Sequence, residues 1–213
     1  MREVFTKEEI AKIICPTDKT FNKGRMTLGD YTDILSSKYC FAKLIQPDVI
    51  VEIGVRAGYS AWAFLQGCNA KNYIGIDADN GKHGGQGGKD GSYNRWASNL
   101  LATTFPNVNL EFIKLDTQTI TINELDIALG IKSKTLLFHI DGDHTKKGVM
   151  HDMDLAATYF GNNRKVYVLI DDTNYINEVQ EGVLDWLSFH SNICNIDNID
   201  FNTKRGDYLV YSI

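Results

Sequence analysis

The sequence is poor in the residues that mark several classes of protein. It has three prolines and four cysteines in 213 residues, and the cysteines form no CxxC pair. Structural zinc sites usually hold cysteines in closely spaced pairs, so we expect no such site here. The scattered cysteines (Cys15, Cys40, Cys68, Cys194) are expected to be reduced and partly buried.

Long apolar runs and clusters of basic residues are also missing. No stretch approaches the roughly 18 apolar residues of a membrane span. The N-terminal stretch MREVFTKEEIAKII lacks the apolar core of a secretion signal. The net charge is −5, and without a basic run this argues against nucleic acid or an anionic membrane as a partner. Together these absences predict a cytoplasmic protein.

Short apolar runs alternate with amphipathic segments along most of the chain. The runs VIVEIGV, NYIGIDAD, NLEFIKLD, TLLFHID and KVYVLIDD are typical of strands buried on both faces. Segments between them, such as YSAWAFLQGC and YNRWASNLLATTF, favour helices, and FNTKRGDYLVYSI favours a closing strand or hairpin. The alternation predicts an α/β fold with a doubly wound, mostly parallel sheet.

The regions outside this alternation suggest how the chain is divided. Residues 1–44 contain two expected helices, TKEEIAKIICP opened by Thr6 and DYTDILSSKYCFAKLIQ, and we interpret them as a helical cap or lid. Residues 45–213 form the main domain. The stretch NGKHGGQGGKDGS at 80–92 has six glycines, which predicts a mobile loop and a second candidate for a lid.

Acidic residues follow the expected strands one after another. Carboxyl ends of parallel strands meet at one edge of a sheet, and ligands bind beyond that edge. Five acidic strand ends in succession therefore predict a single polar cleft. These acids are Glu52, Asp77, Asp116, Asp141, and the pair Asp171 and Asp172.

The first strand ends in a glycine-rich turn, VEIGVRAGYSAW, with the form E-x-G-x-x-x-G-x-S. Gly54 and Gly58 allow close approach of a ligand, and the following helix offers free N–H groups to an anion. Neither dinucleotide nor phosphate-loop spacing is present, so a carboxylate is the expected anion, although a plain strand-to-helix turn is the alternative. Asp77, about twenty residues on, can accept both hydroxyls of a ribose, with Asp79 as the near alternative.

From about residue 45 to 175 the chain resembles class I S-adenosylmethionine-dependent methyltransferases. It is most similar to metal-dependent O-methyltransferases of the catechol type and of the macrolide-sugar and cephalosporin-hydroxylase-like group. The motifs are VEIGVRAGYSA, GIDAD, LDTQT, IDGDH and IDD, in this order. The resemblance implies a Rossmann-like methyltransferase fold with seven strands.

The resemblance also implies a set of residues for S-adenosylmethionine. The first motif and its helix would contact the methionine part, the second would bind the ribose, and LDTQT would flank the adenine. The implied residues are Glu52, Gly54, Gly58, Tyr59, Ser60, Asp77, Asp116, Thr117 and Gln118.

The motifs IDGDH and IDD resemble the metal-binding strand ends of the family. By this resemblance Asp141, Asp171 and Asp172 would be oxygen ligands of Mg²⁺ or Mn²⁺. The chemistry agrees, since a cation removes the repulsion between converging carboxylates. Some members have Asp-Asn or Glu-Asp where this chain has Asp171-Asp172, so the metal and its geometry stay open. Asp143 would lie behind the ligands or face solvent.

His144 lies three residues beyond Asp141, where members of the family place a general base. An imidazole can take a proton near neutral pH. The alternative is that His144 only caps the helix that follows. His151 and Asp152 are expected on a solvated face of that helix.

The predicted function is O-methyl transfer to a hydroxyl of a small molecule, such as a catechol, a sugar or a natural product. No nucleic acid or membrane is expected as a partner, and a homo-oligomer is left open. The alternatives are a metal-independent methyltransferase, a nucleotide-binding oxidoreductase and a non-catalytic binding module. The absence of G-x-G-x-x-G argues against the oxidoreductase.

Overall fold

The structure is a computed structural model that describes residues 4–79, 92–121, 124, 135–161, 164–199 and 207–212. In this part of the chain one sheet has the strand order β3-β2-β1-β4-β5-β7-β6. Strands β1 to β5 are parallel, and β7 runs antiparallel to both β5 and β6. The strands are β1 Val49–Ile53, β2 Asn72–Asp77, β3 Asn109–Lys114, β4 Thr135–Ile140, β5 Lys165–Ile170, β6 Cys194–Ile199 and β7 Asp207–Ser212.

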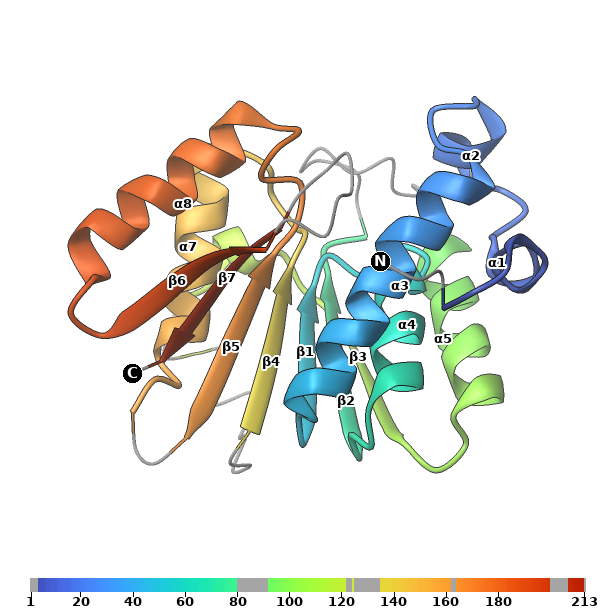
Figure 1. Ribbon diagram of the computed structural model, residues 1–213, viewed down its shortest axis with the longest axis horizontal. Helices are drawn as coiled ribbons and strands as arrows, with labels where there is room; N and C mark the ends of the chain where they lie inside the picture. The colour runs from blue at the N-terminus through green and yellow to red at the C-terminus, as the bar shows by residue number, and fades with distance from the viewer. Residues whose placement is uncertain are drawn as a thin grey trace.

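Helices cover both faces of the sheet, so the predicted doubly wound α/β fold is confirmed (Figure 1). Helices α1, α3, α4 and α5 share one hydrophobic core with the sheet, and α7 and α8 share the other. The short helix α2 lies near the carboxyl edge, and η1 follows β3. The bounds are α1 Lys7–Ile13, α2 Lys19–Asn22, α3 Leu28–Ile45, α4 Tyr59–Gly67, α5 Ser92–Thr104, η1 Thr117–Thr119, α7 Lys146–Ala157 and α8 Asn177–His190.

The central strands are apolar along most of their length because both of their faces are covered. In β1 every residue is buried, and neighbours point to opposite cores: Ile50 packs with α3 and α4, whereas Val51 packs with α7 and α8. Glu52 and His139 break the apolar pattern and are nevertheless buried. Buried charges require partners, and these two residues lie side by side in the β1–β4 register.

The first helices begin where the sequence indicates. Thr6 starts α1 with a capping box: its hydroxyl accepts from the Glu9 N–H, and the Glu9 carboxylate accepts from the Thr6 N–H. Thr27 and Asp30 form the same arrangement at the start of α3. Helix α3 packs along α4 within one core. The lid role of residues 1–44 stays a prediction.

Other expectations can be compared directly with the structure. All four cysteines are free; Cys15 and Cys194 are buried, and Cys40 and Cys68 are half-buried. The glycine-rich stretch 80–92 lies outside the described residues, apart from Ser92 at the start of α5. Among the helices described, none has the length and apolar character needed to cross a bilayer.

Backbone hydrogen bonds align the strand ends at the carboxyl edge. The N–H groups of Gly54, Asp141 and Asp171 donate to carbonyls at the ends of the adjacent strands, those of Ile76, Ile53 and Ile140, at 2.8, 2.8 and 3.0 Å. Gly54 lies so close to β4 that a Cβ atom there would be 2.1 Å from the carbonyl oxygen of Asp141, and its φ is +91°. Glycine is therefore required where the glycine-rich turn leaves β1.

We predict that Gly54→Ala destabilises the protein by more than about 3 kcal/mol, since backbone strain and overlap with the β4 strand end act together. Gly24→Ala is the matched control, because Gly24 has φ +65° but open space around its Cβ position. In Gly24→Ala, backbone strain alone should lower the free energy of unfolding by about 1 kcal/mol. Denaturant unfolding measures both variants, and equal losses would contradict the role given to the close approach of β1 and β4.

Candidate active site

Three side chains from the ends of β4 and β5 converge at the carboxyl edge. Asp141, His144 and Asp172 each place one potential ligand atom within 4.8 Å of the others. His144 Nε2 lies 2.9 Å from Asp141 Oδ1. Two carboxylates and an imidazole are a donor set that divalent cations accept. The structure thus brings together two of the three predicted ligands with the predicted base.

Electrostatics in this cluster favour a protonated histidine when no cation is present. Burial lowers the pKa of His144, but the hydrogen bond to Asp141 and the charges of Asp141 and Asp172 outweigh burial and raise the pKa to about 9. At neutral pH the imidazolium therefore balances part of the negative charge. In that state His144 donates to Asp141 and has no free site for another proton.

Asp171, the third predicted ligand, lies outside this cluster. Its Oδ2 accepts from the Lys38 ammonium at 2.8 Å, and its Oδ1 accepts from the backbone N–H of Asp172 at 2.9 Å. Burial raises the pKa of Asp171, but Lys38 and His139 outweigh it and hold the pKa well below its usual range. The carboxylate is thus ionised and occupied by protein donors.

A buried polar network extends from Asp171 beneath the strand ends. His139 Nε2 lies 2.8 Å from Lys38 Nζ, and His139 Nδ1 lies 2.9 Å from Glu52 Oε1. The Tyr73 hydroxyl donates to the other Glu52 oxygen at 2.6 Å. Glu52 is only 1% exposed. This predicted cofactor residue therefore binds the network rather than facing the edge of the sheet.

The glycine turn after β1 is fixed by Asp77. One Asp77 oxygen accepts from the Arg56 N–H at 2.8 Å, and the other accepts from the Asp79 N–H at 2.7 Å. Arg56 itself has φ +48°, and Gly58 at the N-cap of α4 has φ +76°. Asp77 therefore joins the ends of β1 and β2 in one rigid turn. Ser60 is half-buried in the first turn of α4.

The side chain of Arg56 connects this turn to the N-terminal segment. Its guanidinium pairs with Asp18, which caps α2 and is fully buried. Tyr59 donates to the same carboxylate at 2.9 Å, and Tyr31 donates at 3.3 Å. Burial and Asp18 raise the pKa of Tyr59, so its hydroxyl remains a donor. Tyr59, a predicted cofactor residue, thus holds the N-terminal segment.

The predicted adenine loop is attached to α7. Asp116 caps η1, and Oδ1 of Asp152 accepts from the Thr117 hydroxyl at 2.7 Å and the Gln118 amide at 3.1 Å. The expectation that Asp152 lies on a solvated face is wrong, because the residue is fully buried. His151 is half-buried and donates to the Thr117 carbonyl at 2.8 Å.

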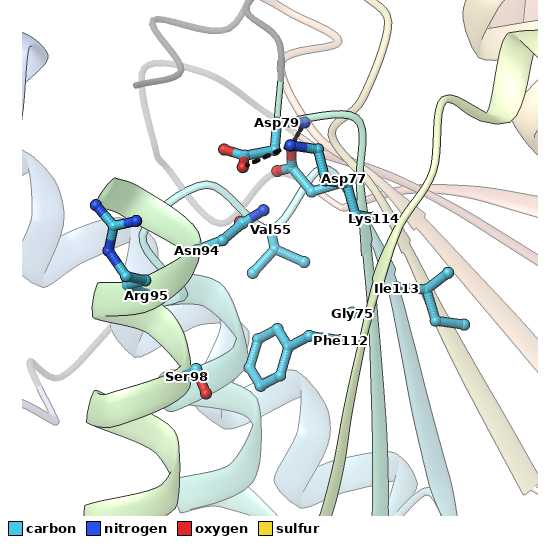
Figure 2. A pocket seen from close by; sticks show the side chains of 10 residues that line it. All are labelled: Val55, Gly75, Asp77, Asp79, Asn94, Arg95, Ser98, Phe112, Ile113 and Lys114. Atoms are coloured by element: carbon cyan, nitrogen blue, oxygen red, sulfur yellow. Dashed lines mark hydrogen bonds and ion pairs between the residues drawn. The ribbon is translucent and has the colours of Figure 1, made fainter. Parts of the chain in front are cut away.

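A pocket of about 560 Å³ lies between α5 and the β2–β3 edge of the sheet. Figure 2 shows Asp77 and Asp79 at one end of the pocket and the Phe112 ring farther along it. Asn94 lines the pocket from α5. The Asp79 carboxylate lies 3.5 Å from Lys114 Nζ. The volume is within the range of small-molecule sites. Its described lining includes Asp77 but none of the three predicted adenine contacts.

Sequence reasoning missed Lys38, Asp18 and Arg56. The partner of Lys38 lies 133 residues away, and Asp18 and Arg56 are 38 residues apart, so spacing along the chain could not reveal them. His139 gave a weak signal, since a histidine inside the apolar run TLLFHI needs a partner if the strand is buried. Asp143 lies beside the cluster and accepts from the Thr145 N–H at 3.0 Å.

Comparison with known proteins agrees with this geometry. A family model described as a methyltransferase domain matches residues 51–173, more than half of the chain. A search of the curated proteins found no match.

Several solved structures share the fold. An O-methyltransferase from Streptomyces achromogenes involved in tomaymycin synthesis, in complex with S-adenosylmethionine, has a TM-score of 0.62 and 14% identity over 99% of this chain and 91% of that one. The Podospora anserina methyltransferase PaMTH1, bound to S-adenosylhomocysteine, has a TM-score of 0.61 and 13% identity, with coverage of 97% and 86%. A Bacillus cereus O-methyltransferase, also in complex with S-adenosylhomocysteine, has a TM-score of 0.57 and 11% identity, with coverage of 97% and 96%.

We predict that Asp18→Asn lowers the free energy of unfolding by about 2–3 kcal/mol, because it removes the charge that neutralises Arg56. Asparagine can still cap α2, so the loss reports the ion pair together with the two tyrosine hydrogen bonds to the same carboxylate. Asp33→Asn, an exposed change on α3, serves as the control and should be nearly neutral. Unfolding in urea measures both, and a neutral Asp18→Asn would contradict the proposed docking of the N-terminal segment through Arg56.

Proposed function

We propose that this chain, which belongs to the methyltransferase domain family, transfers a methyl group from S-adenosylmethionine to a hydroxyl of a small molecule. The observation that carries the proposal is the meeting of two features at one edge of the sheet. One is the glycine turn held by Asp77, and the other is the cluster of Asp141, His144 and Asp172. The glycine turn can bind the methyl donor, and the cluster can bind a hydroxyl and accept its proton.

For the donor, we propose that Asp77 binds the ribose and the turn at Gly54–Gly58 receives the methionine part. Each Asp77 oxygen accepts one backbone N–H, and a carboxylate has about four lone-pair sites. The acid therefore retains acceptors for two hydroxyls. Asp116, Thr117 and Gln118 are proposed to border the adenine, in a loop that Asp152 holds rigid.

For the acceptor, we propose that Asp141 and Asp172 hold a divalent cation such as Mg²⁺ or Mn²⁺. Two close carboxylates with an adjacent imidazole fit such an ion. When bound, the cation would lower the pKa of a hydroxyl placed next to it. The acceptor is proposed to be a sugar or a natural product. One fold relative, which takes part in tomaymycin synthesis, supports a natural product.

The reaction then needs one bond made, one broken and one proton removed. The acceptor oxygen attacks the methyl carbon in line with the sulfur, the carbon–sulfur bond breaks, and S-adenosylhomocysteine leaves. The hydroxyl proton passes to Nε2 of His144. Because charge disappears in this step, fixing the approach of the two substrates and excluding water are the main contributions of the protein.

His144 can act as a base only if the negative charge around it is compensated. Its pKa of about 9 in the cation-free cluster keeps Nε2 protonated at neutral pH. With the charges of Asp141 and Asp172 balanced by a cation, the cause of that shift would be removed and the imidazole of His144 would be free to accept a proton. Cation binding and base activation are therefore linked.

A metal-independent methyltransferase is the second candidate, and one observation favours it. Lys38 neutralises Asp171, which leaves two carboxylates at the cluster instead of the predicted three. In that case His144 and Asp141 would bind the acceptor hydroxyl without an ion. Methyl transfer that survives thorough EDTA treatment would decide for this candidate.

We predict that Asp77→Asn weakens S-adenosylmethionine binding about 5- to 150-fold, the equivalent of roughly 1–3 kcal/mol of lost hydrogen bonds. The asparagine side chain keeps one acceptor for the turn, so the fold should persist. Calorimetric titration measures the affinity, with Asp79→Asn as the comparison, which should change it little. A larger loss in Asp79→Asn would move the ribose contact there, and no binding to the wild type at millimolar concentration would refute the proposed donor.

We predict that His144→Ala lowers the single-turnover rate by about 10²- to 10⁴-fold, as loss of a general base does. The affinity for S-adenosylmethionine should not change. In the wild type, Mn²⁺ affinity should rise between about pH 7 and pH 9, because the cation competes with the proton on His144. In His144→Ala this rise should vanish. A variant that loses Mn²⁺ binding altogether would instead make His144 a ligand. An unchanged rate would refute the base role, since the cap of α7 is already Thr145.

A further inference from the structure

We infer that Asp171 is a positioning residue and not a ligand of the cation. The buried ammonium of Lys38 removes Asp171 from the cluster, and Asp171 in turn sets the backbone of Asp172, whose carboxylate completes the cluster. This inference deepens the proposed function and rests on it for the identity of the ion. It changes the ligand set that the sequence predicted.

Lys38 is buried beside Asp171 and is held in contact with it. It lies in the middle of α3 and is 1% exposed. Its Nζ lies 2.8 Å from Asp171 Oδ2 and 2.8 Å from His139 Nε2. A buried ammonium is strongly destabilising without a counter-charge. Movement of Asp171 toward an ion would leave Lys38 without its carboxylate, so the pair resists such a movement.

Both oxygens of Asp171 already accept from protein donors, and a cation at Oδ2 would compete with the Lys38 ammonium. Oδ2 has the Lys38 ammonium at 2.8 Å and His139 Nε2 at 3.6 Å. Oδ1 accepts from the Asp172 N–H. The residue is 7% exposed. Burial does not separate the two acids, because Asp172 is 2% exposed; what distinguishes Asp172 is that its carboxylate meets Asp141 and His144, which are half-buried at the edge of the sheet.

Asp172 has a backbone conformation that needs support. Its φ is +61°, in the left-handed region, which is unfavourable for a residue other than glycine. The hydrogen bond from its N–H to Asp171 Oδ1 stabilises this conformation at one side of the residue, and bonds from the N–H groups of Tyr175 and Ile176 to its carbonyl stabilise it at the other. With φ fixed, the Asp172 carboxylate turns toward Asp141 and His144.

The chain of contacts connects α3 to the cluster through the interior. It runs from the Lys38 ammonium through the Asp171 carboxylate to the Asp172 backbone. Two claims can be tested separately. The first is that Asp171 does not bind the ion, and the second is that it acts through the acceptor it offers to the Asp172 N–H.

Single variants are poor tests, because removing Lys38 or Asp171 alone leaves a buried charge unpaired. Two double variants remove both charges: Lys38→Met/Asp171→Asn, the amide double variant, and Lys38→Met/Asp171→Ala, the alanine double variant. The amide double variant keeps an oxygen for the Asp172 N–H and an NH₂ group that can donate to His139, whereas the alanine double variant keeps neither. The two proteins therefore differ chiefly in the positioning contact. Asp172→Asn provides the reference for loss of a ligand.

Two measurements are made on the full chain: Mn²⁺ affinity by electron paramagnetic resonance, and hydrogen exchange of the Asp172 amide by NMR without metal. The amide double variant should bind Mn²⁺ within about twofold of the wild type. The alanine double variant should bind it about 2- to 12-fold more weakly than the amide one, the equivalent of one hydrogen bond. Asp172→Asn should lose more than about tenfold in affinity. The Asp172 N–H should exchange about 2- to 12-fold faster in the alanine double variant than in the amide one.

Each outcome decides the inference. If the amide double variant loses Mn²⁺ as severely as Asp172→Asn, Asp171 is a direct ligand and the inference is wrong. If the two double variants exchange the Asp172 N–H equally fast, Asp171 has no positioning role. Failure of the wild type to bind Mn²⁺ would refute the cation in the proposed function, and the hydrogen exchange would still decide whether Asp171 positions Asp172.

Discussion

Electrostatic repulsion among carboxylates at one edge of a parallel sheet is the constraint on which this structure depends. The parallel order of β1 to β5 brings five acidic strand ends to the same level. Carboxylates so placed are stable only when each has donors or a counter-charge. The carboxylates along this edge are stabilised in different ways, so different parts of the edge have different chemistry.

On the β1–β2 side, backbone N–H groups stabilise the carboxylate. Two N–H groups donate to Asp77, and the same bonds hold the glycine turn that we propose receives the methionine part of the donor. Beneath the edge, side chains provide the donors: Tyr73 and His139 for Glu52, and Lys38 for Asp171. These pairs are buried and closed. The cluster of Asp141, His144 and Asp172 has an imidazole as its counter-charge, and two of its three members are half-buried, so an added cation would be bound most readily there.

The N-terminal helices take part in the same compensation. Lys38 of α3 neutralises Asp171, and Asp18, which caps α2, neutralises Arg56 in the glycine turn. The contact between Lys38 and Asp171 is buried, the contact between Asp18 and Arg56 is partly buried, and both reach residues at or just beyond strand ends. The N-terminal segment is therefore joined to the edge of the sheet by charge as well as by apolar packing. One of its two ion pairs lies at the proposed donor side and the other at the proposed acceptor side.

The sequence was sufficient for the fold and for the edge of the sheet at which the acids gather, because both follow from local patterns. Apolar runs identify buried strands, and parallel order places every strand end on one edge. The sequence was not sufficient to predict which residue pairs with each acid. Lys38 looks like any helical lysine, and only the packing of α3 on α4 brings it to Asp171. The positive φ of Asp172 also has no sequence signal, since aspartate only tolerates that conformation.

The most direct test of the account is the position of an ion relative to the donor. Crystals grown with S-adenosylhomocysteine and Mn²⁺ can be measured for anomalous scattering at the manganese edge. The account predicts a single peak in contact with Asp141 and Asp172, with Asp171 still on Lys38 and the ribose on Asp77. A peak coordinated by Asp171, or S-adenosylhomocysteine bound away from Asp77, would contradict it.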